Sequence, residues 1–358
     1  MKLKGIKALL TLCMIVKNEE QTLKNCLSRA ADLAKELVIV DTGSTDKTKS
    51  IALEFTDKVY DFKWCNDFAK ARNFSISKAS NDWVIVLDAD EFIEDFDRKG
   101  ILKFISNENN CKKVGRIKRK SLMEDSFGVK KYFERVNRVF NKKYFHYKGI
   151  IHEQISSMDG EAYETENLAI SVDHIGYTKE VVNRTNKLKR NIDLLNEAMK
   201  DAPDDPYLQY QLGKSYYMLK NYNKASTCFE MALKHDVDYR LEYVSDLVET
   251  YGYSLIDSGR YSDALKLEKF AKYYANADFC FLMALIYMNN AKFTLAVENY
   301  MKCTRFEESK VEGVTSYLSY YNIGVIYDVL GFKEKALEYY NMCGNYEPAI
   351  ARRKAQLN

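Results

Sequence analysis

Short apolar runs alternate with polar and helical stretches along the first ninety residues of the chain. The runs lie within residues 7–20, 36–48 and 84–92, and the second run has a β-branched core. Runs of this length, bounded by charge or turn residues, predict buried strands of a parallel sheet. Residues 21–36 (QTLKNCLSRAADLAKE) have a helical periodicity. The order strand, helix, strand, helix, strand predicts the start of a doubly wound α/β sheet.

Each predicted strand ends in a polar cluster. The clusters are Lys17 to Glu19, Asp41 to Ser44 and Asp88 to Asp90. Ligands of open parallel sheets gather at the carboxyl ends of the strands, so the three clusters are expected to meet at one edge. Asp88 and Asp90 would project from the same side of an extended chain, and their oxygen atoms suit Mg²⁺ or Mn²⁺. This pair predicts a metal-diphosphate site, whereas an aspartate pair alone also occurs in ordinary surface loops.

The sequence DTGSTD at 41–46 predicts a tight turn before a helix. Backbone N–H groups of Thr42 to Ser44 could meet a ligand there. The alternative is an ordinary turn and capping segment.

Taken together, three segments resemble the donor half of a family 2 glycosyltransferase with the GT-A fold. They are CMIVKNEE, VIVDTGSTDKT and DFKWCNDFAKARNFSISKASNDWVIVLDADEF. The resemblance covers residues 8–175 and is strongest to the branch with C-terminal tetratricopeptide repeats, the sublancin-type peptide glycosyltransferases. It implies a Rossmann-like GT-A domain, a nucleotide-sugar donor (UDP by family expectation), a divalent cation (Mn²⁺ or Mg²⁺) and inverting hexosyl transfer.

The resemblance also implies roles for residues of the donor site. Asp41 would accept a hydrogen bond from the nucleotide base, with Lys17, Glu19 and Arg72 flanking that pocket. Arg72 could also face the diphosphate, because a guanidinium matches phosphate oxygens. The remaining donor-site candidates are Trp64 and Asp67 at the sugar pocket, Asp88 at ribose or sugar hydroxyls, and Arg138 with Arg135 at the floor of the site. Trp64 as a core residue and Arg72 as a helix-surface residue remain open alternatives.

A metal site and a catalytic base complete the implied chemistry. Asp90 would hold the metal with Asp88, and His174 in AISVDHIGY would be the third ligand. Glu153 in HYKGIIHEQI is the candidate base for the acceptor, with His152 and the more distant Asp125 as alternatives. Alternatively, His174 is a packed or turn histidine that binds no metal, and Glu153 is a charged residue at a strand edge with no catalytic role.

Basic residues are concentrated in one stretch. Residues 112–148 contain thirteen Lys and Arg against three acidic residues, while the whole chain carries only +3. The stretch contains no recognisable nucleic-acid-binding motif, so nucleic-acid binding explains it poorly. We expect most of these side chains to form a solvated strand face, and some to attract a diphosphate or an acidic acceptor.

Repeated positions of small and aromatic residues mark the C-terminal half. Alanines at 225, 264, 296 and 336, each preceded by glycine or tyrosine positions, follow the pattern of tetratricopeptide repeats. The pattern predicts about four repeats and an all-α domain over 206–358, after a GT-A domain over 1–177 and a helical linker over 178–205. Two alanine intervals exceed 34 residues, which predicts that some helices are lengthened.

Two classes of function are consistent with this organisation. The first is an active glycosyltransferase whose repeats present a peptide or protein acceptor, with a cell-surface glycan as the alternative acceptor. The second is a non-catalytic repeat scaffold with a nucleotide-sugar-binding domain. Repeats of this type also mediate self-association, and no apolar run approaches the length of a membrane span. The eight cysteines lack CxxC pairing or regular spacing, which predicts reduced thiols and a cytoplasmic location.

Overall fold

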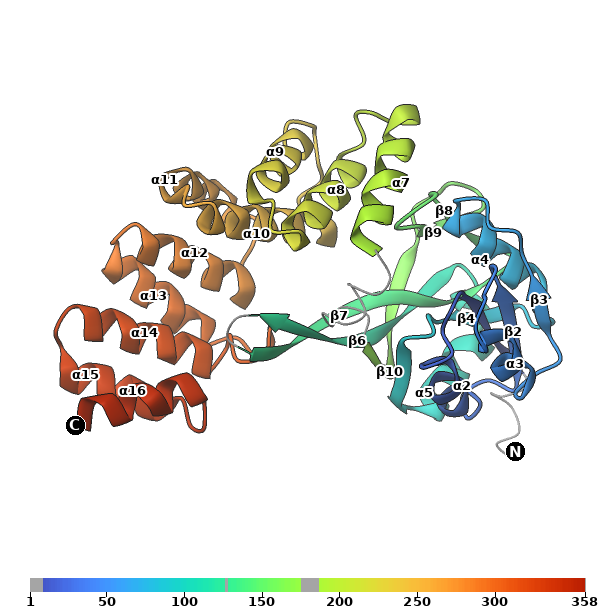
Figure 1. Cartoon of the computed structure of the whole chain (residues 1–358), viewed down its shortest axis with the longest axis horizontal. Coiled ribbons are helices and arrows are strands. Elements are labelled where there is room, and N and C mark those ends of the chain that lie inside the picture. Colours follow the sequence, from blue (N-terminus) through green and yellow to red (C-terminus); the bar gives the residue numbers. More distant parts are fainter. Residues whose placement is uncertain (1–8, 126–127, 175–186, 358) are drawn as a thin grey trace. The chain divides into compact units, whose positions relative to one another are not determined.

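The computed structural model describes residues 9–125, 128–174 and 187–357, except the side chains of residues 123–125, 128–130 and 357. The chain forms two compact units, residues 1–187 and 188–358 (Figure 1). The predicted linker at 178–205 contains helix α7 (Lys187–Asp201), and its residues 178–186 lie outside the described part.

A mixed sheet of eight strands forms the first unit, in the order β3-β2-β1-β4-β7-β6-β10-β5. β1 pairs in parallel with β2 and with β4, so the three strands predicted from the apolar runs lie side by side. The strands are β1 (Leu10–Val16), β2 (Glu36–Asp41), β3 (Val59–Asp61), β4 (Trp83–Val86), β5 (Glu91–Phe96), β6 (Lys113–Asp125), β7 (Gly128–Asn141) and β10 (Glu164–His174). The predicted α/β architecture is therefore present, with antiparallel strands added beyond β4.

Both faces of the sheet are covered. One face packs against α2 (Leu23–Ala30), α3 (Thr48–Leu53) and α5 (Arg98–Ser106), whose apolar side chains include Leu27 and Phe104. The other face packs against α4 (Phe68–Ser77) and the small sheet formed by β8 (Phe145–Lys148) and β9 (Gln154–Ser157). Burial on both faces explains why β1, β2 and β4 read as continuous apolar runs. A short η1 (Glu108–Asn110) follows α5.

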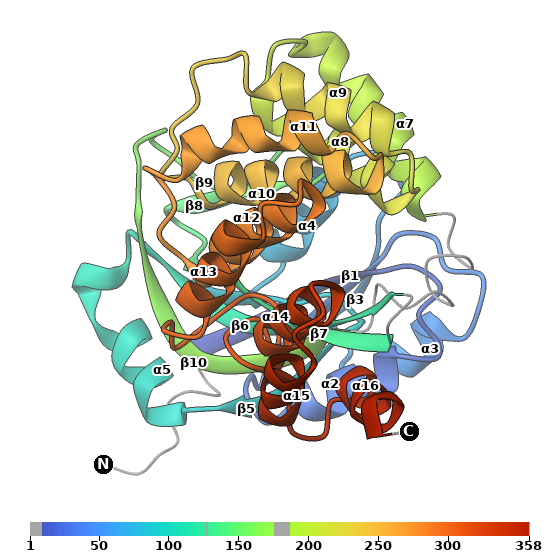
Figure 2. The same ribbon diagram turned by 90° about the vertical axis from the view of Figure 1, so that its left-hand side faces the viewer.

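Paired helices form the second unit (Figure 2). After α7 come α8 (Pro206–Met218), α9 (Tyr222–Ala232), α10 (Glu242–Asp257), α11 (Tyr261–Ala264), η2 (Leu265–Phe270), α12 (Ala277–Asn289), α13 (Phe293–Cys303), α14 (Tyr317–Val329), α15 (Lys333–Met342) and α16 (Glu347–Leu357). All four repeat alanines are fully buried. The small-residue pattern marks the helix contacts, because a Cβ on Gly213 would lie 2.5 Å from the Phe229 ring and one on Gly324 would lie 2.6 Å from the Tyr340 ring.

The long alanine intervals have two different structural causes. α10 has 16 residues where α8, α12 and α14 have 13, so one helix is lengthened as predicted. The second long interval comes from residues 304–316 between α13 and α14, not from a longer helix. Of the described helices, none has both the length and the apolar character needed to cross a membrane.

Candidate active site

The turn after β4 forms the centre of the candidate site. The Glu91 backbone N–H donates to the Asp88 carbonyl at 3.0 Å, and the Asp88 N–H donates to Oε2 of Glu91 at 3.1 Å. From α2, the Cys26 thiol donates to the Glu91 carbonyl at 3.2 Å. These bonds fix the positions of both Asp88 and Asp90, because the turn's polar groups find partners within the fold.

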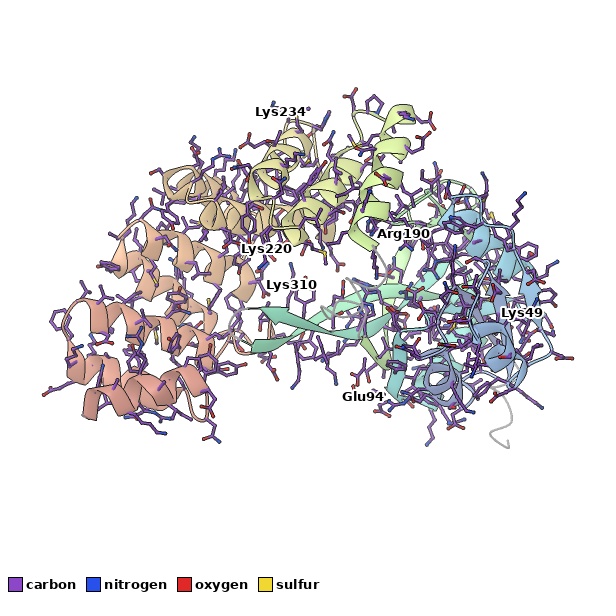
Figure 3. The ribbon with its side chains drawn as sticks, viewed as in Figure 1. Lys49, Glu94, Arg190, Lys220, Lys234 and Lys310 are labelled. Atoms are coloured by element: carbon purple, nitrogen blue, oxygen red, sulfur yellow. The ribbon has the colours of Figure 1, made fainter. Side chains whose placement is uncertain are left out.

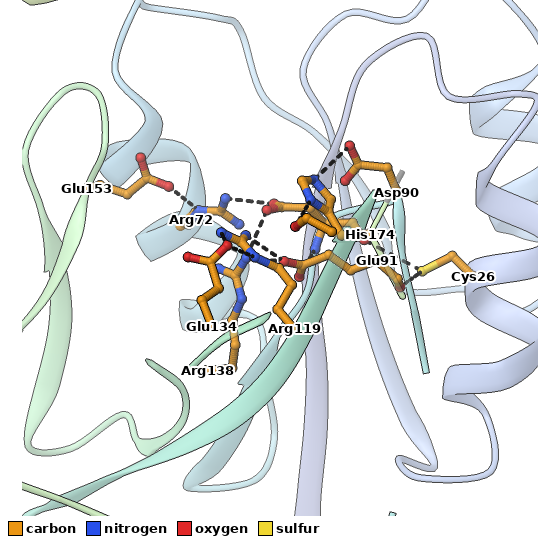
Figure 4. Close-up of polar contacts among 11 residues, drawn as sticks. Cys26, Arg72, Asp90, Glu91, Arg119, Glu134, Arg138, Glu153 and His174 are labelled. Atoms are coloured by element: carbon orange, nitrogen blue, oxygen red, sulfur yellow. Dashed lines mark hydrogen bonds and ion pairs between the residues drawn. The ribbon is translucent and has the colours of Figure 1, made fainter. Parts of the chain in front are cut away.

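Two arginines bind the Asp88 carboxylate (Figure 4). Arg72 on α4 donates from Nη2 to Oδ1 at 2.7 Å, and Arg138 on β7 donates from Nη2 to Oδ2 at 3.0 Å. Burial raises the pKa of the Asp88 carboxyl, but the charges of Arg72 and Arg138 outweigh burial and hold that pKa well below its usual range. Asp88 is therefore an ionised carboxylate with a guanidinium on each oxygen.

Asp90 and His174 face each other on the neighbouring side of the turn. Nε2 of His174 lies 3.5 Å from Oδ2 of Asp90, and Nδ1 of His174 lies 3.0 Å from the Ser121 hydroxyl. The Ser121 contact orients the imidazole so that Nε2 is directed at the aspartate. His174 is buried, as is Ser121.

This pair fits a divalent cation better than Asp88 does. Among the described residues, no three His, Cys, Asp or Glu side chains are grouped to hold a metal ion. Mg²⁺ commonly takes only one or two protein ligands and completes its shell with phosphate oxygens and water. Asp90 and His174 suffice for that arrangement, whereas the guanidinium groups on Asp88 would repel a cation.

Three charged residues that the sequence analysis did not single out extend the site. Glu91 is fully buried and accepts from Arg138 Nη2 at 2.6 Å and from Arg119 Nη1 at 3.1 Å. Arg119 also donates to Glu134 at 2.8 Å. Glu91 directly follows the DAD sequence and could have been noticed for that reason, whereas nothing in the basic stretch distinguishes Arg119 from its neighbours.

A β-bulge sets the position of Arg138. Pairing between β6 and β7 passes from Gly115↔Val139 to Arg116↔Asn137, which leaves Arg138 without a partner residue on β6. Bulges of this kind redirect a side chain and are frequent beside active sites. Arg135, which the resemblance grouped with Arg138, instead donates to the Leu168 carbonyl at 3.5 Å.

Glu153 lies against Arg72 in the segment between β8 and β9. Nε of Arg72 donates to Oε1 of Glu153 at 2.5 Å, and the Glu153 side chain is 10% exposed. The neighbouring His152 has a φ of 49°, a left-handed conformation that non-glycine residues adopt rarely and that is frequent at functional sites. Asp125 ends β6, but its side chain lies outside the described part of the chain.

Asp41 closes the turn after β2. Its Oδ1 accepts from the N–H groups of Gly43 and Ser44, both at 2.7 Å, and its buried Oδ2 has no hydrogen-bond partner. Gly43 has a φ of 105°, which explains the glycine at that position. Two of the turn's N–H groups are thus used by Asp41 itself, which corrects the expectation that they meet a ligand. The unpartnered Oδ2 is the group left for one.

The turns after β1 and β2 are joined by hydrogen bonds. The Glu19 N–H donates to the Thr48 hydroxyl at 2.6 Å, and Oδ1 of Asn18 accepts from the Thr45 N–H at 2.8 Å. The Glu19 carboxylate accepts from Thr22 at 2.8 Å, and Lys17 is exposed at the start of the turn. Lys17, Glu19 and Asp41 therefore lie on neighbouring turns at the carboxyl ends of β1 and β2.

Trp64 and Asp67 lie at the start of α4. Asp67 is the N-cap of α4, with Oδ1 accepting from the Lys70 N–H at 2.9 Å. Trp64 is partly exposed, donates to Asn66 at 2.8 Å and packs edge-on against Phe68. The observed role of Asp67 is structural, and the sugar-pocket role of both residues stays a prediction.

Comparisons with known families agree with this geometry. Residues 11–158 match glycosyl transferase family 2, and residues 206–239 and 277–310 each match a tetratricopeptide repeat.

Individual proteins of known sequence also match. The chain is 28% identical over 256 residues to the TPR repeat-containing protein Synpcc7942_0270 of Synechococcus elongatus, covering 68% of this chain and 62% of that one. It is 25% identical over 270 residues to the SPbeta prophage-derived glycosyltransferase SunS of Bacillus subtilis, covering 72% of this chain and 63% of that one. These alignments span less than two thirds of the relatives' own length.

Two further matches cover less. A segment of 86 residues is 38% identical to the poly-beta-1,6-N-acetyl-D-glucosamine synthase of Staphylococcus epidermidis, covering 22% of this chain and 21% of that one. Among solved structures, YrrB, a TPR protein with an unusual peptide-binding site, matches 49% of this chain and 88% of its own at 21% identity and a TM-score of 0.40.

Proposed function

Because residues 11–158 form a glycosyl transferase family 2 domain and tetratricopeptide repeats follow it, we propose that the protein moves a sugar from a UDP-sugar to a peptide or protein acceptor. One observation carries the proposal. Two pairs, Asp90 with His174 and Arg72 with Glu153, meet around one turn at the carboxyl end of β4. In parallel sheets this edge is where ligands bind.

Groups of known chemistry are available for each part of the donor. The unpartnered Oδ2 of Asp41 would accept the imide N–H of the base, since that buried oxygen otherwise lacks a hydrogen bond. Arg72 and Arg138 supply two guanidinium groups, each suited to phosphate oxygens. Lys17 and Glu19 lie on the turns beside Asp41 and would flank the base.

Asp90 and His174 would hold Mn²⁺ or Mg²⁺. When bound, the ion would offset the negative charge that develops on the departing diphosphate.

Glu153 would act as the base of an inverting transfer. The acceptor oxygen or sulfur forms a bond to the anomeric carbon while the bond from that carbon to the diphosphate oxygen breaks. The acceptor proton passes to the Glu153 carboxylate, and the diphosphate leaves with the bonding electrons. His152 is the neighbouring alternative base, and its side chain is partly exposed.

The repeats support a polypeptide acceptor. The alignment to SunS covers 270 residues, more than the 187 residues of the first unit, so it extends into the repeats. Repeat domains provide extended surfaces that suit peptides. The match to the glucosamine polymer synthase supports a glycan acceptor but covers only 22% of the chain. Self-association through the repeats, and a cytoplasmic location suggested by eight free cysteines, belong to the same proposal.

Turnover of a panel of nucleotide sugars with Mn²⁺, with and without a chelator and candidate peptides, tests the function. We expect chelator-sensitive release of nucleoside diphosphate from one donor, and a loss of at least about 100-fold in Asp90→Ala. Asp95→Ala is the matched control, because Asp95 is exposed on β5 five residues further on. Calorimetric binding of a nucleotide sugar without any turnover would favour the non-catalytic scaffold instead, and no binding of any nucleotide sugar would contradict both functions.

A further inference from the structure

Arg72 connects the candidate base to the donor-binding aspartate. It donates from Nη2 to Asp88 at 2.7 Å and from Nε to Glu153 at 2.5 Å, and its side chain is 7% exposed. Arg72 makes the hydrogen bond and ion pair that the structure gives the Glu153 carboxylate. The orientation of Glu153 therefore depends on where the Arg72 guanidinium lies.

The fold brings these two residues together through the next residue of α4. The Asn73 side chain donates to the Tyr147 carbonyl and accepts from the Tyr147 N–H, both at 2.9 Å, which fixes α4 against β8. At the start of the helix, the Phe68 N–H donates to the Ile150 carbonyl at 2.9 Å. The segment that carries Glu153 is thereby held beside Arg72 by contacts independent of the ion pair.

The Arg72 guanidinium has unused hydrogen-bonding capacity. Its Nη1 is buried and has no hydrogen-bond partner. A buried N–H without a partner is costly, more so on a charged group, so an anionic oxygen that reaches it gains a strong interaction. A diphosphate carries more charge than a single carboxylate and can take two N–H groups of one guanidinium at once.

We propose that Arg72 is a positioning residue that exchanges Glu153 for the diphosphate when the donor binds. The inference rests on the proposed function, in which Arg72 and Arg138 bind the phosphate oxygens of the donor. Once the guanidinium turns to the phosphate oxygens, the Glu153 carboxylate loses its ion pair and becomes available to take the acceptor proton. Donor binding thus readies the base, and Glu153 competes with the donor for Arg72 until then.

The competition predicts that removing the base tightens donor binding. Glu153→Gln keeps the size of the side chain but loses the charge that holds Arg72. We expect the full chain with Mn²⁺ to bind UDP roughly tenfold more tightly in this variant, measured by calorimetry, although transfer slows. If Glu153 is a base that does not hold Arg72, the UDP affinity of Glu153→Gln should equal that of wild type. If Glu153 only stabilises the fold of the site, UDP should bind Glu153→Gln more weakly than wild type.

Two controls separate the exchange from a general effect of charge. Asp173→Asn removes a carboxylate one residue from His174 that is paired with Lys120 and makes no contact with Arg72, and we expect its UDP affinity to stay within about twofold of wild type. In an Arg72→Gln background, adding Glu153→Gln should give no further tightening. Thermal melts of each variant identify any that do not fold.

The outcomes are distinguishable. Unchanged UDP affinity in Glu153→Gln, or equal tightening in Asp173→Asn, overturns the exchange while leaving the proposed function intact. Wild-type protein that binds neither UDP nor a UDP-sugar contradicts the proposed function itself. If Arg72→Gln does not fold, the comparison of Glu153→Gln with Asp173→Asn still decides the question.

Discussion

Seven charged side chains form a continuous series of ion pairs around the turn after β4. The series runs Glu153, Arg72, Asp88, Arg138, Glu91, Arg119, Glu134 (Figure 4). Buried ions are tolerated only when paired, since the loss of one partner leaves a charge without compensation in a low dielectric. Within this series Glu91 is the most critical carboxylate, because it is fully buried and contacts two arginines.

Replacing Glu91 should destabilise the first unit strongly. We expect Glu91→Ala to lower the free energy of unfolding by about 3–5 kcal/mol, because Arg138 and Arg119 both lose a partner. Both tryptophans, Trp64 and Trp83, lie in this unit, so their fluorescence during urea denaturation reports on it alone.

Glu94→Ala is the control for this measurement. Glu94, labelled in Figure 3, is exposed on β5, the strand that also carries Glu91, and pairs with Lys120 on β6. Its removal should cost less than about 1 kcal/mol. Equal costs in Glu91→Ala and Glu94→Ala would show that the buried network contributes no special stability.

Some of the residues at this turn could be predicted from the sequence and others could not. Asp88, Asp90, Arg72, Glu153, Arg138 and His174 were all singled out from motifs, and the structure brings them to one turn. Glu91 was not singled out, although it directly follows the DAD sequence. Arg119 and Ser121 were also missed, because strand register decides which side chains of β6 face the site. The unpaired position of Arg138 likewise has no local signature, since a bulge depends on both strands.

At the scale of elements, the helix pairs of the second unit depend on close contact between a glycine and a ring. Gly213 on α8 faces Phe229 on α9, and Gly324 on α14 faces Tyr340 on α15. These contacts are why the repeat was readable in the sequence, because only a small residue fits there. The sequence did not predict that residues 304–316 connect two helices, because an interval between alanines does not show where the added residues lie.

Gly213→Ala should destabilise the repeats despite the better helix propensity of alanine. Propensity favours alanine by about 1 kcal/mol, but its Cβ would lie 2.5 Å from the fully buried Phe229 ring. Overpacking of that kind costs about 1–3 kcal/mol, so we expect a net loss of about 1 kcal/mol in thermal melts followed by circular dichroism. Adding Phe229→Leu should remove the penalty of the alanine; a higher melting temperature for Gly213→Ala alone would contradict the contact.

A buried carboxylate links α10 to the segment that precedes α14. Glu249 accepts from Lys310 at 2.7 Å and from Ser245 at 3.1 Å, with Asp246 and Asp278 also nearby. Burial raises the pKa of Glu249 from 4.5 to about 7, an increase that Asp246 adds to and Lys310 opposes. Lys310, labelled in Figure 3, also donates its backbone N–H to Asp278 at 2.9 Å.

This pKa predicts a pH dependence of stability. Between pH 4.5 and 7 the folded protein keeps a proton on Glu249 that the unfolded chain has released. The contribution of Glu249 to the free energy of unfolding is therefore fully present below pH 4.5 and is lost as the pH rises to about 7. The change corresponds to roughly 3 kcal/mol. From pH 5 to pH 8 the melting temperature of wild type should therefore fall relative to that of Glu249→Gln. The same change of melting temperature with pH in both proteins would contradict the raised pKa.

At the scale of the whole molecule, the proposed donor site and the repeats belong to separate units. Every residue assigned to the donor site lies between Lys17 and His174, within residues 1–187. The net charge of +3 hides a local excess on residues 112–148, which form β6, β7 and β8 of the first unit. The two-part organisation was predictable because the apolar strand runs and the alanine spacing differ so strongly.

Separating the units should separate binding from transfer. We expect residues 1–187 alone to bind UDP with Mn²⁺ within about threefold of the full chain and to lose modification of a peptide substrate, scored by mass spectrometry. Full peptide modification by this fragment would show that the repeats do not present the acceptor, and would favour the glycan alternative.

The bulge at Arg138 also affects which changes of length the β6–β7 hairpin can accept. β6 and β7 continue for many residues beyond it, to Asp125 and Gly128, away from the ion pairs around Asp88. Because the bulge fixes the register at the end of the hairpin nearest the site, residues can be gained or lost in pairs at the far end without moving Arg138. Changes of hairpin length by pairs of residues should therefore leave the ion pairs of Arg138 with Asp88 and Glu91 in place.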